Sequence, residues 1–418
     1  MKINKEIRDT IVKRLFVSLG VLLFIRVGTF LPVPGINTSD LALYIQTHSL
    51  TKSLVSTFSG DDTFVIGLFT LNIFPYINAS ILVQLIISFS PTLSKLQKEG
   101  DLDGRRSLNR LTRFITLIWA FIQSISLAIY LKQILFDWSL GLAFEIVIWL
   151  TTGSMIVLWL SELITDYGLG NGASLLIYTN IISSLPNLCK KVITENGQNL
   201  TIPSLVGVAF LVFVSLYGIV LLQEGVRIIP LISSKQLNQT SLQDSGVSNN
   251  YIPLRFNQAG VMPIILTTAV LVIPNYVSNL GLLPTLSLPV FLESSKLIYW
   301  ISYFSLILIF SSFYSTIVLN PKDISDQLQK MAVTIPGIRP GIQTTFYLKQ
   351  VMKRITFVGA IMLAVLATVP NFIEVTLNIS SLNGLSTTSL LIMAGVVLDL
   401  VREVKNIYFS NVYNNMYQ

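Results

Sequence analysis

The sequence predicts an all-α polytopic membrane protein with ten transmembrane helices. Of its 418 residues, 52% are hydrophobic and only 12% are charged, whereas soluble domains carry about 25% charged residues. The mean hydropathy of the chain is +0.68. A helix needs about 20 apolar residues to cross the hydrocarbon core of a bilayer. Windows of this kind are centred near residues 24, 82, 121, 152, 179, 212, 270, 309, 365 and 395.

The 28 Lys and Arg residues are unevenly distributed over the connections between these windows. If the ten spans cross in alternate directions, 22 of these residues fall on one side, together with both ends of the chain. The positive-inside rule then predicts that this side faces the cytoplasm or the plastid stroma. The alternation also supports an even number of spans.

The first span follows a basic segment, and no small-residue cleavage site separates it from Pro32 and Pro34. We therefore expect a retained helix and not a removable signal peptide.

Further along, residues 56–71 form a short, weakly helical piece with Asp61 and Asp62 near its start. A piece too short to span can stay at membrane depth only where protein or a water-filled cavity surrounds it.

The second span, LNIFPYINASILVQLIISFSP at 71–91, carries polar residues that a lipid-facing helix does not need. Ile73, Ile77, Ser80 and Gln84 follow one another at i, i+4, i+7 and i+11, which places them along one face of a helix. A stripe of this kind fits a surface that faces water or a partner helix. Interhelical hydrogen bonding by Ser80 and Gln84 explains the same pattern, so both interpretations stay open.

Basic residues concentrate in the connection between spans 2 and 3, which we expect to be one short loop. It carries Lys95, Lys98, Arg105, Arg106, Arg110 and Arg113. Such a cluster attracts anionic lipid headgroups, and the phosphates of ribosomal RNA would be attracted by the same field.

Two long polar connections, 223–258 and 321–354, lie on the same side and are the sizeable surfaces outside the membrane. We expect them to contact a soluble partner. In the second one, PGIRPG at 336–341 places two prolines and two glycines around Arg339. This pattern predicts a shaped tip in preference to a passive loop.

The sequence contains almost no enzyme signature. GLGNGA at 168–173 resembles a dinucleotide-binding fingerprint, but it lies between two predicted membrane helices without a preceding strand, so we interpret it as a turn. A single cysteine, Cys189, and a single histidine, His48, exclude an internal disulfide and a His-rich metal cluster. We therefore expect no enzymatic activity, no cofactor and no metal.

A secondary transporter of small solutes is the alternative function, because such proteins also contain many helices, some of them broken. Ion-coupled carriers keep ionisable residues near the membrane midplane. Here Arg26, Glu145, Glu162 and Asp399 lie near the ends of spans, where they can snorkel or cap. The nearly uncharged interior favours a route that does not bind ions or protons.

Several long stretches resemble the SecY family of protein translocase channel subunits, almost from end to end of the chain. They are RVGTFLPVPGI (26–36), NIFPYINASILVQL (72–85), SPTLSKLQKEGDLDGRRSLNRLTR (90–113), ITDYGLGNGASLLI (164–177), FNQAGVMPII (256–265), NPKDISDQLQKMAVTIPGIRPGIQT (320–344) and TSLLIMAGVVLD (388–399). Chance similarity among apolar helices does not explain matches in the polar connections. The resemblance implies a channel that conducts unfolded, signal-bearing polypeptides and releases hydrophobic segments laterally into lipid.

The resemblance also implies two inverted five-helix halves around a central pore. They are residues 1–190, with a plug at 56–71, and residues 191–418, with the large connections 223–258 and 321–354. In the family a ring of apolar side chains seals the waist of the pore. The matching positions are Ile73, Ile77, Ala173, Ile177, Ile265 and Ile392. Ala173 is smaller than the residue usual in the family, which implies a looser seal or compensation by Leu175 or Leu176.

A plug and a lateral gate complete the channel that the resemblance implies. The matching plug residues are Phe58, Asp61, Asp62, Phe64 and Leu68. The gate would open between the helix after Pro75 and the helix that starts near Gly260. Its polar cluster would comprise Gln84, Gln123 and Thr268.

In this family the SecA motor ATPase and the ribosome dock on the two large connections, and Arg339 matches the position on which motor coupling depends. Further candidates for partner binding are Arg105, Arg106, Lys322 and Lys330. The tip of the first connection, SLQDSGVSNN at 241–250, has no basic residue. We therefore favour docking of the motor over docking of the ribosome.

The remaining partners implied by the resemblance are SecE, a SecG-like small subunit, signal-bearing precursor proteins and membrane lipids. Frequent Ile, Leu, Ser and Asn, reduced loops and low charge resemble a plastid-encoded member of the family. This implies the thylakoid membrane, with both termini in the stroma. A bacterial inner membrane with cytoplasmic termini is the alternative.

Overall fold

The computed structural model describes residues 5–34, 67–90, 93, 102–132, 139–195, 202–233, 251–258, 260, 262–264, 266–267, 270, 296–318, 320–377 and 387–417. The chain divides into two compact units by its contacts. One comprises Met1–Asn196 with Val396–Gln418, and the other comprises Gly197–Gly395.

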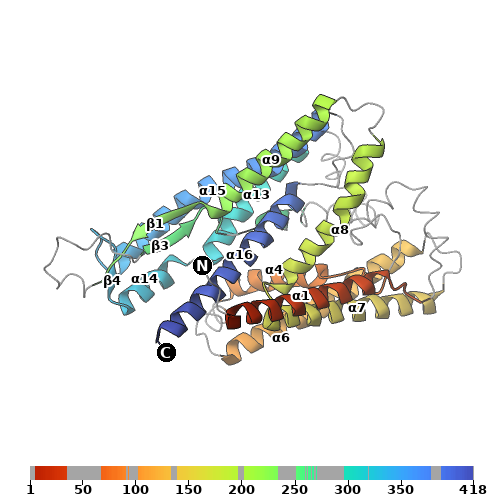
Figure 1. Cartoon of the computed structure of the whole chain (residues 1–418), viewed down its shortest axis with the longest axis horizontal. Coiled ribbons are helices and arrows are strands. Elements are labelled where there is room, and N and C mark those ends of the chain that lie inside the picture. The colour runs from red at the N-terminus through yellow and green to blue at the C-terminus, as the bar shows by residue number, and fades with distance from the viewer. Residues whose placement is uncertain are drawn as a thin grey trace. The chain divides into compact units, whose positions relative to one another are not determined.

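The first unit is built from long helices around α7 (Figure 1). Its elements are α1 (Lys5–Phe30), α4 (Phe74–Phe89), α6 (Leu102–Leu131), α7 (Leu140–Tyr167), α8 (Gly172–Glu195) and the later part of α16 (Thr387–Tyr417). α7 packs on α1, α6 and α8, and α4 packs along α6. Ile146, Leu150, Val157 and Ile164 of α7 are all buried. Their spacing of four and seven residues is that of one helix face turned toward its neighbours.

An irregular segment, residues 67–73, lies against α1 and α7 before α4 begins. A Cβ atom added at Gly28 in α1 would meet the ring of Phe69, and one added at Gly153 in α7 would meet the main-chain carbonyl oxygen of Leu68. Small residues let main chains approach closely between membrane helices. The two glycines therefore create the space that this segment occupies.

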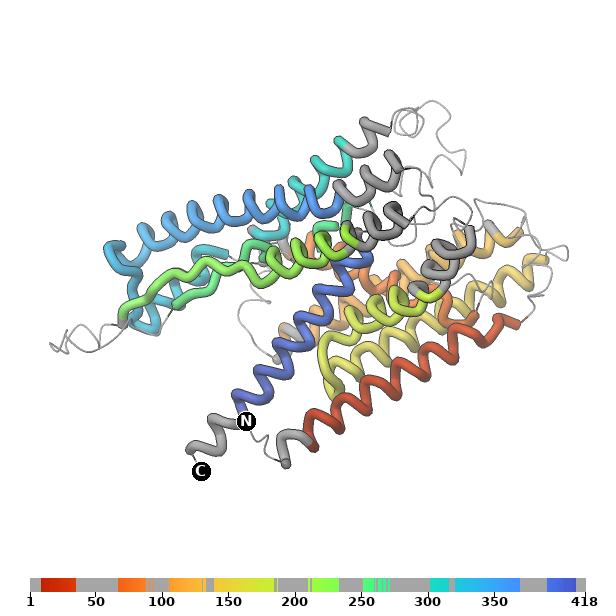
Figure 2. The backbone as a smooth tube through the Cα atoms, turned by 45° about the horizontal axis from the view of Figure 1, so that its top comes forward, coloured from red at the N-terminus to blue at the C-terminus, as the bar shows by residue number. Residues whose placement is uncertain are grey.

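The second unit combines apolar helices with two short antiparallel β pairs. Its elements are α9 (Ile202–Glu224), β1 (Val226–Pro230), β2 (Ile232–Ser233), β3 (Tyr251–Arg255), α13 (Lys296–Val318), α14 (Pro321–Lys330), β4 (Val333–Thr334), α15 (Ile342–Leu377) and the first turns of α16. β1 follows α9 directly (Figure 2) and pairs with β3, and β2 pairs with β4. α15 packs on α9, α13, α14 and β3, so it organises this unit.

Two hydrophobic clusters form the core of the second unit, and α15 contributes to both. The first joins α9, α13, α15 and the start of α16 through residues such as Ile219, Ile307 and Leu363. The second joins the strands and α14 to the first turns of α15, and it includes Leu348. Phe256 packs against both clusters.

Within the described residues, three helices are long and apolar enough to cross a membrane: Arg106–Ile129, Leu140–Tyr167 and Ile342–Thr368. Four shorter apolar helices accompany them: Phe74–Ile87, Gly172–Ser183, Phe213–Glu224 and Ile301–Ser315. Nine of the predicted span centres lie in helices of the structure, and the tenth, residue 270, is helical in a segment that is only partly described.

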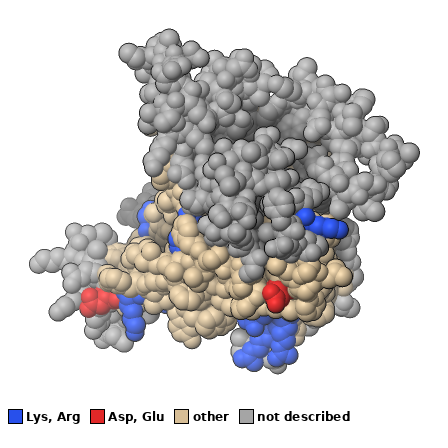
Figure 3. Space-filling view, turned by 90° about the vertical axis from the view of Figure 1, so that its right-hand side faces the viewer, with Lys and Arg blue, Asp and Glu red and all other residues tan. Residues whose placement is uncertain are grey.

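The helices expose large apolar side chains outward. Examples are Phe16, Phe114, Phe144, Phe213 and Phe357, each more than 60% exposed. In the space-filling view the described surface is mostly uncharged, with Lys and Arg in a few small groups (Figure 3). A surface of this kind suits lipid and not water.

The polar connections are more ordered than the sequence predicted. Arg105 to Arg113 do not lie on a loop, because α6 begins at Leu102 and carries them on its first turns. The connection 321–354 contains α14, β4 and the start of α15. The beginning of α14 has the usual signals: Asn320 accepts a hydrogen bond from the Lys322 main-chain N–H at 3.1 Å, and Pro321 opens the helix.

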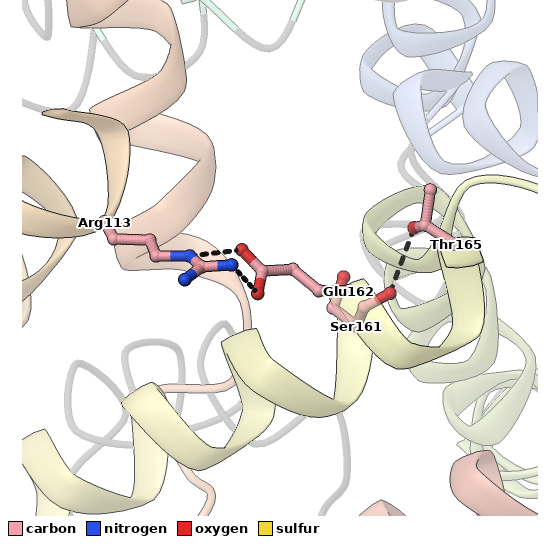
Figure 4. Close-up of polar contacts among 4 residues, drawn as sticks. All are labelled: Arg113, Ser161, Glu162 and Thr165. Carbon is pink, nitrogen blue, oxygen red and sulfur yellow. Dashed lines mark hydrogen bonds and ion pairs between the residues drawn. The ribbon is translucent and has the colours of Figure 1, made fainter. Parts of the chain in front are cut away.

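An ion pair joins the start of α6 to the end of α7. Arg113 Nε donates to Glu162 Oε1 at 2.9 Å, and the second guanidinium nitrogen donates to Oε2 at 2.8 Å (Figure 4). Thr165, one turn further along α7, donates instead to the Ser161 carbonyl oxygen of its own helix at 3.0 Å. The bidentate geometry gives this contact between the two packed helices a defined orientation.

Replacing Gly153 by alanine should lower the melting temperature of the purified protein by several degrees. The new Cβ meets the main chain of Leu68, and overpacking of this kind costs about 1–3 kcal/mol, more than the ~1 kcal/mol that alanine gains over glycine in a helix. The matched control is Gly20→Ala in α1, where a Cβ has nothing within 4 Å. Equal melting temperatures for the two variants would contradict the close approach of residues 67–70 to α7.

A double-mutant cycle with Arg113→Gln and Glu162→Gln should give a coupling free energy of up to about 1 kcal/mol that decreases with added salt. The pair is bidentate, but the Arg113 side chain is 53% exposed, so solvent screens the attraction. Exchanging the two charges should restore most of the stability. The control is the single contact between Arg402 and Asp399 within α16, at 3.2 Å. Zero coupling at low salt for Arg113 and Glu162 would refute this contact.

Candidate channel and docking sites

The end of the predicted plug segment is held by its main chain to the residues that follow α1. The Leu68 N–H donates to the Leu31 carbonyl oxygen at 2.9 Å, and Gly67 forms an antiparallel bridge with Pro32. Thr70 Oγ1 donates to the Gly67 carbonyl oxygen at 2.6 Å. Residues 67–71, expected to be weakly helical, form turns instead. The other predicted plug residues, Phe58, Asp61, Asp62 and Phe64, lie outside the described residues.

Asn72 occupies a strained position at the junction between this segment and α4. Its φ angle is +47°, in a region that side-chain-bearing residues seldom adopt. The side chain is buried, and within the part of the chain that the structure describes its Oδ1 atom has no hydrogen-bond partner. The positive φ of Asn72 was not predicted from the sequence, although asparagine adopts this region more often than most side-chain-bearing residues.

Ile73 and Ile77 lie one turn apart at the start of α4. Ile73 is the residue before the helix, Pro75 opens the helix without needing a hydrogen-bond donor, and the Ile77 N–H donates to the Ile73 carbonyl oxygen at 3.1 Å. Both side chains are buried. The stripe predicted along this face therefore begins apolar and buried, and it continues to Ser80 and Gln84, which are half-buried.

Ala173 and Ile177 lie one turn apart at the start of α8, and both are half-buried. The predicted turn before them is a connection of four residues, 168–171, between α7 and α8. The Leu169 N–H donates to Ser18 Oγ of α1 at 2.8 Å, and the Gly172 N–H donates to Thr165 Oγ1 at 3.0 Å. These bonds fix the point at which α8 begins.

Of the remaining ring and gate residues, Ile392 lies half-buried in α16, whereas Ile265 and Thr268 lie outside the described residues. Gln84 in α4 and Gln123 in α6 are half-buried on helices that pack together. Gln123 Oε1 is buried, and no hydrogen-bond partner for it lies among the described residues.

Trp119, one turn before Gln123 on α6, was not singled out from the sequence. Its indole Nε1 is also buried without a partner among the described residues. The two positions are separated by four residues and so share a helix face. This face therefore presents a donor and an acceptor that are available to a polar group.

The tip at 336–341 has a defined shape that presents Arg339 to solvent. Gly337 and Gly341 have φ angles of +76° and +99°, which glycine adopts without steric cost. The Ser325 hydroxyl of α14 donates to the Gly341 carbonyl oxygen at 3.0 Å, and Thr344 Oγ1 donates to the Arg339 carbonyl oxygen at 2.9 Å. The Arg339 main chain is thus held while its side chain is exposed.

The other predicted docking residues lie on helices. Lys322 and Lys330 are exposed near the two ends of α14. Arg105 and Arg106 lie in the first turns of α6, and the Arg106 side chain is exposed. Among the described residues, no group of three His, Cys, Asp or Glu residues could hold a metal ion.

Comparison with known proteins gives a family match and full-length relatives. The family model described as SecY matches residues 67–401. The protein translocase subunit SecY of Trieres chinensis is 66% identical over 98% of this chain and 98% of its own length. The subunit of the same name from Guillardia theta is 42% identical over 99% of this chain and 97% of its length. That of Synechocystis sp. is 38% identical, covering 96% and 93%.

Solved structures give the same fold. A SecY structure whose plug domain is described as stabilising the closed state of the translocation channel has a TM-score of 0.66 at 17% identity, covering 97% of this chain and 93% of that chain. Sec61 in a canine ribosome–channel complex has a TM-score of 0.61 at 16% identity, with the same coverage. The helical fold is therefore that of the SecY and Sec61 channels.

The predicted family is confirmed, and the alternative of a small-solute transporter has no support among these relatives. The family match covers most of the chain, and the relatives match its polar connections as well as its apolar helices. The chain belongs to the SecY family of protein translocase subunits.

Proposed function

We propose that the chain forms the polypeptide-conducting pore of a Sec translocase, a non-enzymatic conduit through which unfolded, signal-bearing proteins cross a membrane. The observation that carries the proposal is the match to translocase subunits over nearly the whole chain. The proposed architecture has ten spans in two inverted halves, 1–190 and 191–418, with the pore between them.

The pore is sealed in this proposal by apolar side chains contributed in pairs. Ile73 with Ile77, and Ala173 with Ile177, each lie one turn apart at the start of a helix. Ile265 and Ile392 complete the ring. An apolar constriction blocks water and ions by dewetting, yet it deforms around an extended chain. The plug at 56–71 adds a second barrier.

The lateral gate lies in this proposal between α4 and the helix that follows Gly260, with Gln84, Gln123 and Thr268 as its polar cluster. Hydrogen bonds across a helix seam in lipid stabilise the closed gate by roughly 0.6–2 kcal/mol each. A signal helix of about 20 apolar residues gains several tenths of a kcal/mol per residue on entering lipid. The gate therefore opens when a signal is present and closes when none is.

The energy for transport comes from a docked partner, because the proposed conduit has no nucleotide site of its own. We favour the SecA motor, bound to the exposed tip around Arg339 and to Lys322, Lys330, Arg105 and Arg106. Sec61, a structural neighbour, is described in a complex with the ribosome. For this chain the ribosome is the less favoured partner, since 241–250 lacks basic residues. SecE and a SecG-like subunit complete the assembly.

The proposed location is the thylakoid membrane, with both termini in the stroma. The relatives reported above include algal and cyanobacterial proteins, and the excess of Lys and Arg on one side sets the orientation. A bacterial inner membrane is the alternative.

A photo-crosslinking residue placed at Ile77 should form an adduct with a signal-bearing precursor arrested during transport. The adduct should move along the precursor only when the motor and ATP are present, because the ring surrounds whichever segment is in transit. The matched control is the same residue at Phe144, an exposed position on α7. If Phe144 gave adducts and Ile77 and Ile177 gave none in an engaged complex, the pore assignment would be wrong.

Arg339→Glu should reduce ATP-driven translocation at least tenfold while leaving the melting temperature unchanged. The Arg339 side chain is exposed and contributes little to folding, so its loss acts on the partner. Arg339→Lys should retain part of the activity. Lys132→Glu, at the start of the connection predicted to lie on the opposite side, serves as the control. Equal effects of Lys132→Glu and Arg339→Glu would argue against docking at the tip.

A further inference from the structure

Residues 256–260, FNQAG, connect β3 to the helix that follows Gly260, and their beginning is tightly seated. The Phe256 N–H donates to the Gly225 carbonyl oxygen at 3.0 Å. A Cβ atom added at Gly225 would meet the Phe256 ring, and one added at Gly359 in α15 would meet the Phe256 carbonyl oxygen. Since Phe256 also packs against both hydrophobic clusters of this unit, the segment starts from a fixed point.

Two polar side chains, Ser315 and Thr356, then tie Gln258 to two helices. Ser315 Oγ in α13 donates to Gln258 Oε1 at 2.9 Å and lies 2.7 Å from Thr356 Oγ1 in α15. A serine hydroxyl has one proton, and Ser315 gives it to Gln258, so Thr356 must be the donor in the second bond. The result is a chain of hydrogen bonds from α15 through α13 to Gln258, in which each bond polarises the next.

This chain of hydrogen bonds is buried and specific. Ser315 and Thr356 are 3% and 7% exposed. Hydroxyl groups on apolar helices ordinarily bond to a carbonyl oxygen of their own helix, as Thr368 Oγ1 does to Ala364 at 2.9 Å. Ser315 and Thr356 bond to other elements instead. In a lipid-embedded unit, where the hydrophobic effect does not hold helices together, such contacts decide where a helix lies.

The backbone directly after Gln258 is built to turn. Asn257 Nδ2 donates to the Gly260 carbonyl oxygen at 2.9 Å, which closes a local turn. Gly260 has a φ angle of +63° and no neighbouring atom within 4 Å of a Cβ position. Glycine adopts this conformation without steric cost and is not confined to it. Gln258 is held by its hydrogen bond to Ser315, and Gly260 has wide freedom in its main-chain angles. Together they form a hinge.

Among the described residues, the Gln258 side chain is bonded through Oε1 to Ser315. Its Nε2 atom is buried, and no acceptor for it lies in the part of the chain that the structure describes. The contact with Ser315 is therefore the described side-chain bond that holds Gln258 in place.

We propose that Gln258, Ser315 and Thr356 form a clasp that positions the first turn of the helix after Gly260 and sets how readily that helix leaves its resting position. The inference rests on the proposed function in taking this helix as one side of the lateral gate. The three are positioning residues in this role, with no contact to the precursor required. If the clasp is weakened, a less apolar signal sequence is sufficient to open the gate.

The test compares two precursors that differ only in a lysine inserted in the apolar core of the signal, using the assembled complex with motor and ATP. The measured quantity is the transport of the weakened precursor relative to the intact one. Thr356→Val and Ser315→Ala should each raise this ratio about three- to tenfold, the change that corresponds to one lost hydrogen bond. Thr356→Ser keeps the hydroxyl and should leave the ratio unchanged.

Matched controls use the same substitutions at hydroxyls that bond only to their own helix. These are Thr368→Val in α15 and Ser305→Ala in α13, whose hydroxyl donates to the Ser302 carbonyl oxygen at 3.0 Å. An unchanged ratio in Thr356→Val and Ser315→Ala at normal abundance overturns the clasp. An equal rise in Thr356→Ser or in the controls also overturns it.

Hydrogen exchange of the main-chain amides of 262 and 264–267, measured without any precursor, gives a second readout. Thr356→Val should accelerate this exchange about three- to tenfold relative to Thr356→Ser and Thr368→Val. Unchanged exchange overturns the clasp whether or not precursors are transported. If exchange accelerates but even the unmodified complex transports no precursor, the clasp stands and the proposed function fails.

Discussion

The need to satisfy main-chain polar groups in a water-free environment constrains this structure more than any single apolar contact. A bilayer core offers no water to an irregular segment, and three irregular segments within the described residues find hydrogen-bond partners in the protein. In 67–73, Leu68 bonds to Leu31, which follows α1. In 168–171, Leu169 bonds to Ser18, and in 256–258, Phe256 and Gln258 bond to Gly225 and Ser315. Glycines at the contact points let the main chains approach.

These three segments also precede the helices on which the proposed channel depends. Ile73 and Ile77 follow the first segment, Ala173 and Ile177 follow the second, and Ile265 follows the third in sequence. The positions of Ile73, Ile77, Ala173 and Ile177 are therefore set by local bonds at helix beginnings. Apolar helix faces alone would not set them, because lipid competes equally for such faces.

Much of the helix pattern could be predicted from apolar windows, and α14 could have been predicted from Asn320, Pro321 and Asp323 at its start. The pairing of Arg113 with Glu162 could not, since 49 residues separate them. Residues 67–71 were expected to belong to a weakly helical piece, but their main chain bonds to Leu31 and forms internal turns. Hydropathy also does not distinguish two kinds of hydroxyl group. Some bond to a carbonyl oxygen of their own helix, whereas that of Ser315 joins two other elements.

The most direct test of the conduit is transport by the purified chain, with its small partner subunits, in sealed liposomes. A precursor added outside with the motor and ATP should become resistant to protease, and only if it carries a signal. Small sugars, amino acids and ions should not equilibrate across the same membranes. Protease resistance that depends on signal and ATP is the result expected of a polypeptide channel. Solute uptake without any protected precursor would contradict it and return the chain to the class of small-solute transporters.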